Sequence, residues 1–223
     1  MATTSISSVS WEERAFERSA AVQRSRERIA NQVRLMLDAA HRLILIKGDA
    51  FTTQELAAEA GVALQTFYRY FSSKDELLLA VIGDSLAEAC ERWSEAASQL
   101  ADPLDRLRLY LLASLERLEA DDDIAAPAKF VVAARWRLHR QFPKELADAE
   151  QPFVELLREA VQDAVDAGQL KPSDVTWDPW FLGELVRSVY HFYAFAEHPE
   201  GDIEVVKDRL WQFCLTALGG RRR

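Results

Sequence analysis

The chain has 223 residues, a formal net charge of −9 and a hydrophobic fraction of 49%. This apolar content is enough for the core of one ordinary domain and a smaller one, which excludes a wholly disordered protein. No apolar run reaches the roughly 18 residues that a membrane-spanning helix needs, and the polar N-terminus lacks the pattern of a secretory signal. We therefore expect a cytoplasmic protein with no membrane-bound part.

The charge is distributed unevenly along the chain. Residues 1–82 hold 10 Lys or Arg and 10 Asp or Glu, whereas residues 83–223 hold 17 and 26 and so carry the whole negative excess. A neutral front with clustered arginines is compatible with DNA phosphates, and an acidic rear that repels them helps to orient the molecule.

The cysteines and histidines point away from a catalytic or metal site. Cys90 and Cys214 lie far apart in helical patterns, which predicts reduced packing residues rather than a disulfide or a metal site. No close metal-ligand pairing is present among the four histidines, His41, His139, His191 and His198. The chain also lacks a nucleophile elbow, a phosphate-cradling glycine loop and an HExxH motif. We expect neither an enzyme nor a protein with a cofactor.

Helical periodicity dominates the chain and no alternating strand pattern is present, so the predicted fold is all-α. The Ser/Thr-rich first ten residues are expected to be disordered, and the Ser10-x-x-Glu13 spacing then predicts an extra helix over 11–21. The remaining helices are predicted over residues 30–47, 53–60, 63–70, 74–98, 103–119, 126–141, 145–167, 178–197 and 202–218.

A helix-turn-helix is predicted in the first third of the chain. The Thr52-x-x-Glu55 spacing is typical of a capping box that opens the helix over 53–60. Gly61 stands where a left-handed residue ends a helix, and a second short helix over 63–70 follows. Two short helices joined by such a turn are typical of this motif.

The second short helix is expected to be amphipathic, because its residues turn by about 100° each around the axis. Its core side holds Ala63, Leu64, Phe67 and Phe71. Its opposite side holds Gln65, Thr66, Tyr68, Arg69 and Tyr70. Gln pairs with adenine and Arg with guanine in the major groove, whereas hydroxyls and the ammonium of Lys74 suit backbone phosphates. The alternative is an ordinary polar surface on a small bundle.

Residues 36–82, MLDAAHRLILIKGDAFTTQELAAEAGVALQTFYRYFSSKDELLLAVI, resemble the DNA-binding domain of TetR-type transcriptional regulators. The resemblance rests on Asp38-Ala39-Ala40, Lys47-Gly48, Thr53, Ala60-Gly61-Val62, Thr66-Phe67-Tyr68, Phe71 and Lys74. It implies DNA contacts through Thr53, Gln65, Thr66, Tyr68, Tyr70 and Lys74. Ala63 departs from the family pattern, which often has a capping Ser at this position.

The resemblance also implies how the chain is divided. An N-terminal extension covers 1–29, a three-helix DNA-binding domain 30–80, a helical ligand-binding and dimerisation domain 81–219 and a tail 220–223. A homodimer would bind a palindromic double-stranded operator as a repressor and be released by a small, largely apolar effector. The alternatives are a ligand-binding or protein-interaction module with a vestigial helix-turn-helix, and a helical hydrolase.

A basic segment precedes the first domain helix. It holds Arg24, Arg26, Arg28 and Arg34. We expect an arm, Arg28 included, that reaches adjacent phosphates or the minor groove. The alternative is a set of solvated helix charges paired with Glu27.

The last two predicted helices carry the candidate dimer interface. The helix over 178–197 is apolar nearly all round, so it must be buried on several faces. With the last helix it predicts a four-helix interface through Phe181, Leu185, Val189, Phe192, Leu210 and Phe213. A central helix buried in a monomer is the alternative.

Apolar stripes with a few polar groups predict a ligand pocket among the helices that begin near residues 74, 103 and 126. The candidate lining is Cys90, Trp93, Leu107, Tyr110, Leu111, Ser114, Phe130 and Ala134. The alternative for each of these is ordinary solid core. Arg135, Arg137 and Arg140 could bind an anionic ligand head, but a solvated helix face is the favoured interpretation.

Overall fold

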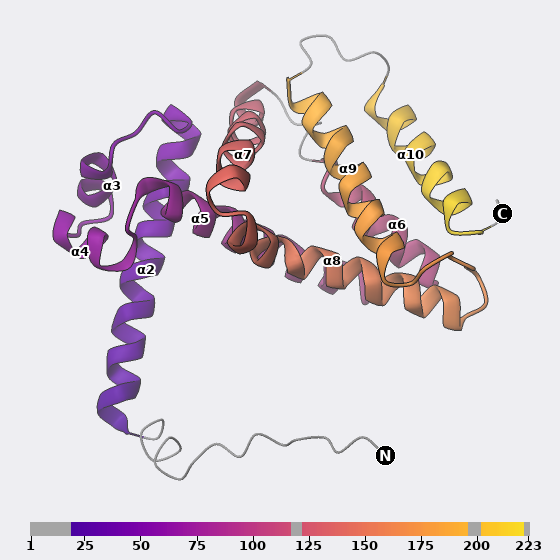
Figure 1. Ribbon diagram of the computed structural model, residues 1–223, viewed down its shortest axis with the longest axis horizontal. Helices are drawn as coiled ribbons and strands as arrows, with labels where there is room; N and C mark the ends of the chain where they lie inside the picture. Colours follow the sequence, from indigo (N-terminus) through magenta and orange to yellow (C-terminus); the bar gives the residue numbers. More distant parts are fainter. Residues whose placement is uncertain (1–18, 117–121, 196–201, 221–223) are drawn as a thin grey trace.

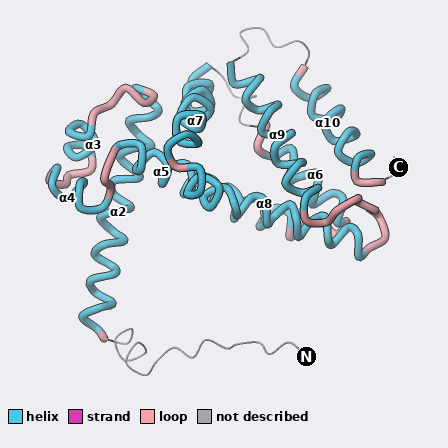
Figure 2. The backbone as a smooth tube through the Cα atoms, viewed as in Figure 1, coloured by secondary structure: helices cyan, strands magenta, loops and turns pink. Residues whose placement is uncertain are grey.

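Every regular element in the computed structural model is a helix, within the residues that the structure describes (19–116, 122–195 and 202–220). The helices are α2 Ala20–Lys47, α3 Thr53–Glu59, α4 Leu64–Tyr70, α5 Lys74–Ala97, α6 Pro103–Ala113, α7 Asp122–Gln141, α8 Pro143–Asp166, α9 Trp177–Phe195 and α10 Ile203–Ala217. Figure 1 shows α3 and α4 at one end of the molecule, with α9 and α10 at the other. The loops that join α2, α3, α4, α5 and α6 are short, whereas residues 167–176 form a longer loop between α8 and α9 (Figure 2). The predicted all-α class is confirmed within the described residues. None of the described helices is long and apolar enough to cross a membrane.

The start of α2 differs from the prediction. A separate helix near residue 30 was wrong, because α2 runs without interruption from Ala20 to Lys47. Its buried residues all lie from Met36 onward, so its first half is not held by a core. The sequence from Ala20 onward contains neither Gly nor Pro until Gly48, and hence nothing that would break the helix. The predicted helix over 11–21 lies almost wholly outside the described residues.

Capping bonds set the bounds of the two short helices. The hydroxyl of Thr52 accepts a bond from the Glu55 amide, and the Glu55 carboxylate accepts one from the Thr52 amide, which is the predicted capping box. Gly61 then adopts φ +66°, a conformation that side chains other than Gly rarely take. At the start of α4, Ala63 has the extended backbone of a cap but no side-chain bond.

The apolar side of the helix-turn-helix packs into a core that the rear of the chain completes. Met36 of α2, Leu56 of α3 and Phe67 of α4 have no exposed surface and belong to one cluster. Ala134 and Leu138 of α7 belong to the same cluster and are equally buried. The helix-turn-helix end of the molecule is therefore built partly from α7, a helix far from it in sequence.

The rear of the chain has a second core around α5 and α8. These two long helices pack against each other, and α6 and α9 cover them. Leu107 and Leu111 of α6 and Leu157 of α8 are fully buried there, together with Cys90 and Cys214. Burial raises the pKa of both thiols to about 11, so both cysteines stay protonated packing residues, as predicted.

We predict that Ala63→Ser raises the free energy of unfolding by about 1 kcal/mol, because Ser supplies the missing acceptor to the first amides of α4. Urea unfolding of the two proteins measures the difference. Ala63→Val is the control, since its side chain also extends beyond the β-carbon but offers no acceptor. Equal midpoints for the Ser and Val variants would show that the bare cap is no weakness of α4.

Candidate nucleic-acid interface and ligand cavity

The outer face of α4 is polar and open to solvent. Gln65 and Arg69 are exposed, and Tyr68 has 52% of its surface exposed, whereas Phe67 between them has none. The Phe67 ring meets the Tyr68 ring edge-on, with centroids 5.0 Å apart, so the buried ring supports the exposed one. Ala63, expected on the core side, is instead exposed because it caps the helix rather than continuing it.

Neighbouring helices hold the hydroxyl groups of this face. The Tyr68 hydroxyl lies 3.3 Å from the hydroxyl of Thr53, which starts α3. The Tyr70 hydroxyl donates a 2.7 Å bond to the side-chain oxygen of Gln32 on α2. The Arg69 guanidinium lies 5.8 Å from the centre of the Tyr70 ring. Donors and acceptors from three helices are thus presented on one side, and the predicted contact residues Thr53, Gln65, Thr66, Tyr68, Arg69 and Tyr70 gather there.

Lys74, at the start of α5, is engaged within the protein. Its ammonium donates to the backbone oxygens of Asp49 and Phe51 and lies 4.4 Å from the centre of the Phe51 ring. Partial burial is the main reason that its pKa is lowered. Since an ammonium has three protons, one remains for an anion. Lys74 therefore also ties the loop between α2 and α3 to α5, a role that its place in the sequence does not reveal.

Arg137 of α7 reaches the same loop. Its guanidinium donates to the Asp49 carboxylate at 2.9 Å and to the Asp75 carboxylate in the first turn of α5 at 3.0 Å. One side chain thereby joins α7, the loop before α3 and the start of α5. The interpretation of Arg137 as a solvated charge on a helix face missed this pairing, because its partners are 88 and 62 residues away in sequence.

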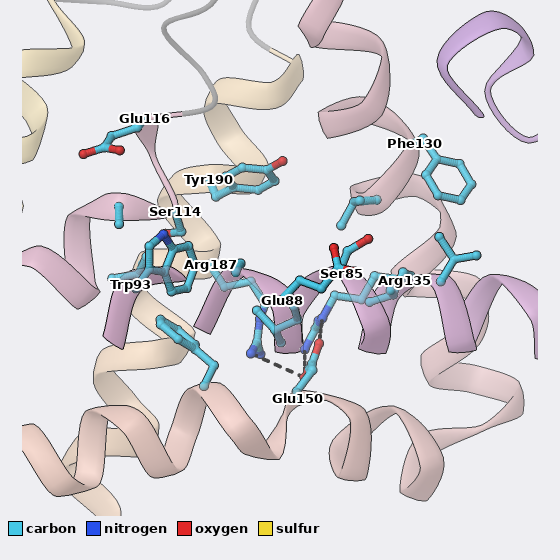
Figure 3. A pocket seen from close by; sticks show the side chains of 18 of the residues that line it. Ser85, Glu88, Trp93, Ser114, Glu116, Phe130, Arg135, Glu150, Arg187 and Tyr190 are labelled. Atoms are coloured by element: carbon cyan, nitrogen blue, oxygen red, sulfur yellow. Dashed lines mark hydrogen bonds and ion pairs between the residues drawn. The ribbon is translucent and has the colours of Figure 1, made fainter. Parts of the chain in front are cut away.

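A cavity of about 970 Å³ is bounded by six helices: α2, α5, α6, α7, α8 and α9. Three of the predicted ligand residues line it: Trp93, Ser114 and Phe130. Figure 3 shows Trp93 and Ser114 toward one end and Phe130 toward the other. The other five lie outside the lining because they pack in the two cores: Cys90, Leu107, Tyr110, Leu111 and Ala134. The helical stripes marked apolar faces but could not show which of them meet without a gap.

A cluster of charged side chains in the cavity wall was not predicted. Arg135 of α7 forms a two-pronged ion pair with Glu150 of α8, at 2.7 and 3.2 Å. Arg187 of α9 approaches the same carboxylate at 3.4 Å (Figure 3). Arg187 also bonds to Glu184. Arg135, Glu150 and Arg187 are all about 14–15% exposed, so water screens these charges poorly. Two cations and two anions leave the cluster neutral.

Uncharged polar groups add to this lining. The His41 ring of α2 lies 2.9 Å from the Ser85 hydroxyl of α5. Burial, followed by the positive charge of Arg135 and Arg187, lowers the pKa of His191 and keeps its ring neutral. The Ser114 hydroxyl is buried without a hydrogen-bond partner in the described part of the chain. The cavity therefore offers donors and acceptors beside apolar and aromatic walls, the combination that binding pockets for small molecules have.

No group of three or more His, Cys, Asp or Glu residues that could hold a metal ion occurs among the described residues.

Residues 36–81 match the family described as bacterial regulatory proteins, tetR family. The match lies within the segment from α2 to α5, which holds the helix-turn-helix.

Comparison with other proteins finds similarity over different lengths. The chain is 49% identical over 47 residues to the uncharacterized HTH-type transcriptional regulator YvaF of Bacillus subtilis, a match that covers 21% of this chain and 25% of that protein. It is 20% identical over 137 residues to the fatty acid metabolism regulator protein of the same organism, covering 61% and 69%. The crystal structure of Thermus thermophilus FadR with lauroyl-CoA superposes with a TM-score of 0.64 at 20% identity, covering 86% and 97%. The structural likeness shows a shared fold.

Several aromatic rings are exposed on the last two helices, α9 and α10. Phe181 and Phe192 of α9 and Phe213 of α10 are 58%, 61% and 64% exposed. Leu185 and Val189, also predicted in the interface, are half-buried against the rear core. Leu210 is buried in that core, so its assignment to a dimer interface was wrong: its side of α10 faces the protomer's own helices.

Of the four arginines expected to form an arm, Arg34 is engaged within the protein. Its guanidinium pairs with Asp84 at 2.7 Å and Glu88 at 3.4 Å on α5. Arg28 lies on an exposed part of α2. The basic segment is thus a helix and not an extended arm.

We predict that Glu150→Ala lowers the free energy of unfolding by about 3 kcal/mol, because it leaves the buried Arg135 and Arg187 guanidinium groups with only the more exposed Glu184 carboxylate as counter-charge. Thermal or urea unfolding measures the loss. Glu155→Ala is the control, because Glu155 pairs with Arg158 at the surface and its loss costs about 1 kcal/mol or less. Similar losses for the two variants would mean that the cavity cluster is effectively solvated.

Proposed function

We propose that this protein is a sequence-specific DNA-binding transcriptional regulator, a repressor that a small molecule releases from its operator. The exposed polar face of α4 carries the proposal: Gln65 and Arg69 are exposed beside a hydroxyl-bearing Tyr68, on a helix whose Phe67 has no exposed surface. Such a face, held rigidly by a three-helix core, fits the major groove of duplex DNA.

The contacts divide by chemistry. Gln65 and Arg69 would read base edges, because an amide and a guanidinium each bond to two atoms of a purine. Thr53, Tyr68 and the free proton of Lys74 would bind phosphates, which set position rather than sequence. Thr66 and Tyr70 flank the helix and complete the surface, although the Tyr70 hydroxyl must exchange Gln32 for a phosphate in order to contact DNA.

The cavity is the proposed effector site. Its volume of about 970 Å³ suits a molecule of substantial size. Trp93, Phe130 and Val186 would enclose an apolar body, and the Arg135 cluster would hold a polar end. The similar fold of Thermus thermophilus FadR holds lauroyl-CoA. We therefore propose an effector with a long apolar chain and a polar head, for which an acyl-CoA is the first compound to test.

The response would travel through α7. This helix lines the cavity with Phe130 and Arg135, and two residues later Arg137 holds the loop before α3 and the start of α5. A ligand that shifts α7 changes where α3 and α4 stand. The effector acts only through its different affinity for the two arrangements.

A homodimer supplies the second reading head. Phe181, Phe192 and Phe213 expose large rings on α9 and α10, at the end of the molecule opposite to α4. Large exposed apolar surface is typical of protein interfaces. Two copies joined there would present two α4 helices to the two halves of a palindromic operator.

We predict that Gln65→Ala lowers discrimination at one base position by about 1–3 kcal/mol, while Tyr68→Phe weakens binding to every sequence alike. Competition binding with single-base variants of a fragment from upstream of the protein's own reading frame measures both effects. If Gln65→Ala instead weakens all fragments equally, Gln65 contacts no base. A wild-type protein that binds no such fragment above the level of random DNA would refute the proposed function.

We predict that lauroyl-CoA releases the bound fragment and raises the melting temperature, since saturation at about 100 times Kd stabilises the folded protein by about 2.7 kcal/mol. Fluorescence anisotropy of labelled DNA follows the release. Free CoA is the control without an apolar chain. Ser114→Phe fills part of the cavity and should bind DNA but resist release. If lauroyl-CoA releases the Ser114→Phe variant as readily as the wild type, the effector does not occupy this cavity.

A further inference from the structure

The first half of α2 projects from the molecule without a core to hold it. Of residues 20–31 all but Val22 are exposed, and Figure 1 shows this part of the helix extending past α3 and α4, away from the other helices. Twelve residues of helix span about 18 Å. An isolated helix of this length is marginal in water, so packing within the protomer does not account for it.

One row of side chains on this projection continues from the reading helix. The side chain of Gln32 accepts a hydrogen bond from Tyr70 of α4 at 2.7 Å. Arg28 and Arg24 lie four and eight residues earlier, one and two turns along the same side of α2. Arg26 is turned by about 200° from both of them around the helix axis. Arg24 and Arg28 therefore extend the polar face of α4, and Arg26 does not.

The projection is cationic in an acidic protein. Residues 20–31 hold three Arg and one Glu, a net charge of +2, in a chain whose net charge is −9. Within the described part of the chain, Arg24, Arg26 and Arg28 make no ion pair, unlike Arg34, which is bonded to α5. Unpaired arginines in a row beside a DNA-reading helix fit phosphates, since a guanidinium binds phosphate with two parallel bonds.

We propose that this face of α2, formed by Arg24 and Arg28, binds the phosphate backbone of duplex DNA just outside the base pairs that α4 reads. The proposal rests on the proposed DNA-binding function and adds a second contact with no sequence preference. Because the segment is a helix, the contact has a fixed reach: about 18 Å corresponds to about five base pairs of flanking duplex.

Salt dependence tests the proposal. Each phosphate contact contributes about 0.9 to the slope of log K against log salt concentration. The full-length Arg24→Gln/Arg28→Gln variant should therefore lower the slope by about 2 for each protomer. At about 0.1 M salt its affinity for a fragment with long flanks should fall at least about tenfold. Gln has nearly the helix propensity of Arg, so α2 is kept, which circular dichroism checks.

Arg26→Gln is the matched control, because it removes the same charge from the opposite side of the same helix. Its slope should change by less than about 0.5, well short of the double variant's change. A second comparison uses two duplexes, one trimmed to the shortest fragment that the wild type binds and one with about ten base pairs added at each end. The wild type should gain affinity from the added flanks, and the double variant should not.

The outcomes separate the two proposals. If the wild type binds the trimmed duplex but gains nothing from flanks, and the double variant keeps the wild-type slope, the α2 contact is wrong and the reading role of α4 stands. If Arg26→Gln lowers the slope by half as much as the double variant, the effect is general charge and the specific row is wrong. If the wild type binds no fragment, both proposals fail.

Discussion

One face of α7 is buried in the core of the helix-turn-helix end of the molecule. The rest of the structure depends on this constraint. Ala134 and Leu138 have no exposed surface and pack with Met36, Leu56 and Phe67 of the three-helix unit. Burying a leucine stabilises a fold by about 1.5–3 kcal/mol, so α7 cannot leave this core without a large loss. Phe130, one turn before Ala134 in the same core, and the adjacent Arg135 form part of the cavity wall. The helix-turn-helix end and the cavity therefore share α7.

Polar interactions set the position of α7 relative to the segments around it. Packing of apolar side chains tolerates small rotations, whereas the bonds of Arg137 to Asp49 and Asp75 require particular positions of two separate segments. On the cavity side, Arg135 is held by Glu150, which Arg187 also approaches. Poorly screened ion pairs of this kind add little net stability, but they favour one arrangement over nearby alternatives. The cavity wall and the loop before α3 are therefore connected through Arg135 and Arg137, which are two residues apart on α7.

Electrostatics complements this arrangement. The negative excess lies in residues 83–223, whereas the front is neutral overall and has unpaired arginines on α2. The net negative charge of the rear repels a polyanion, whereas the front does not. Several basic side chains of the front bond within the protein: Lys74 bonds to the loop before α3, and Arg34 bonds to α5. Among the described residues of the front, the basic side chains without such a bond lie on the exposed face of α4 and on the projecting half of α2.

Local patterns were enough to predict much of this protein. The sequence by itself determined the all-α class, the capping box at Thr52, the left-handed Gly61 and the outward face of Gln65 and Arg69, because helix periodicity and capping depend on residues three or four positions apart. Only the tertiary structure decided that α2 is continuous from Ala20, that Leu210 is a core residue, and that the cavity has a charged wall. Those features depend on which helix faces meet and on partners such as Arg137 and Asp49, 88 residues apart. A helical stripe says that a face is buried, but whether it meets solid core, a cavity or a second copy is settled by the packing of elements far apart in the chain.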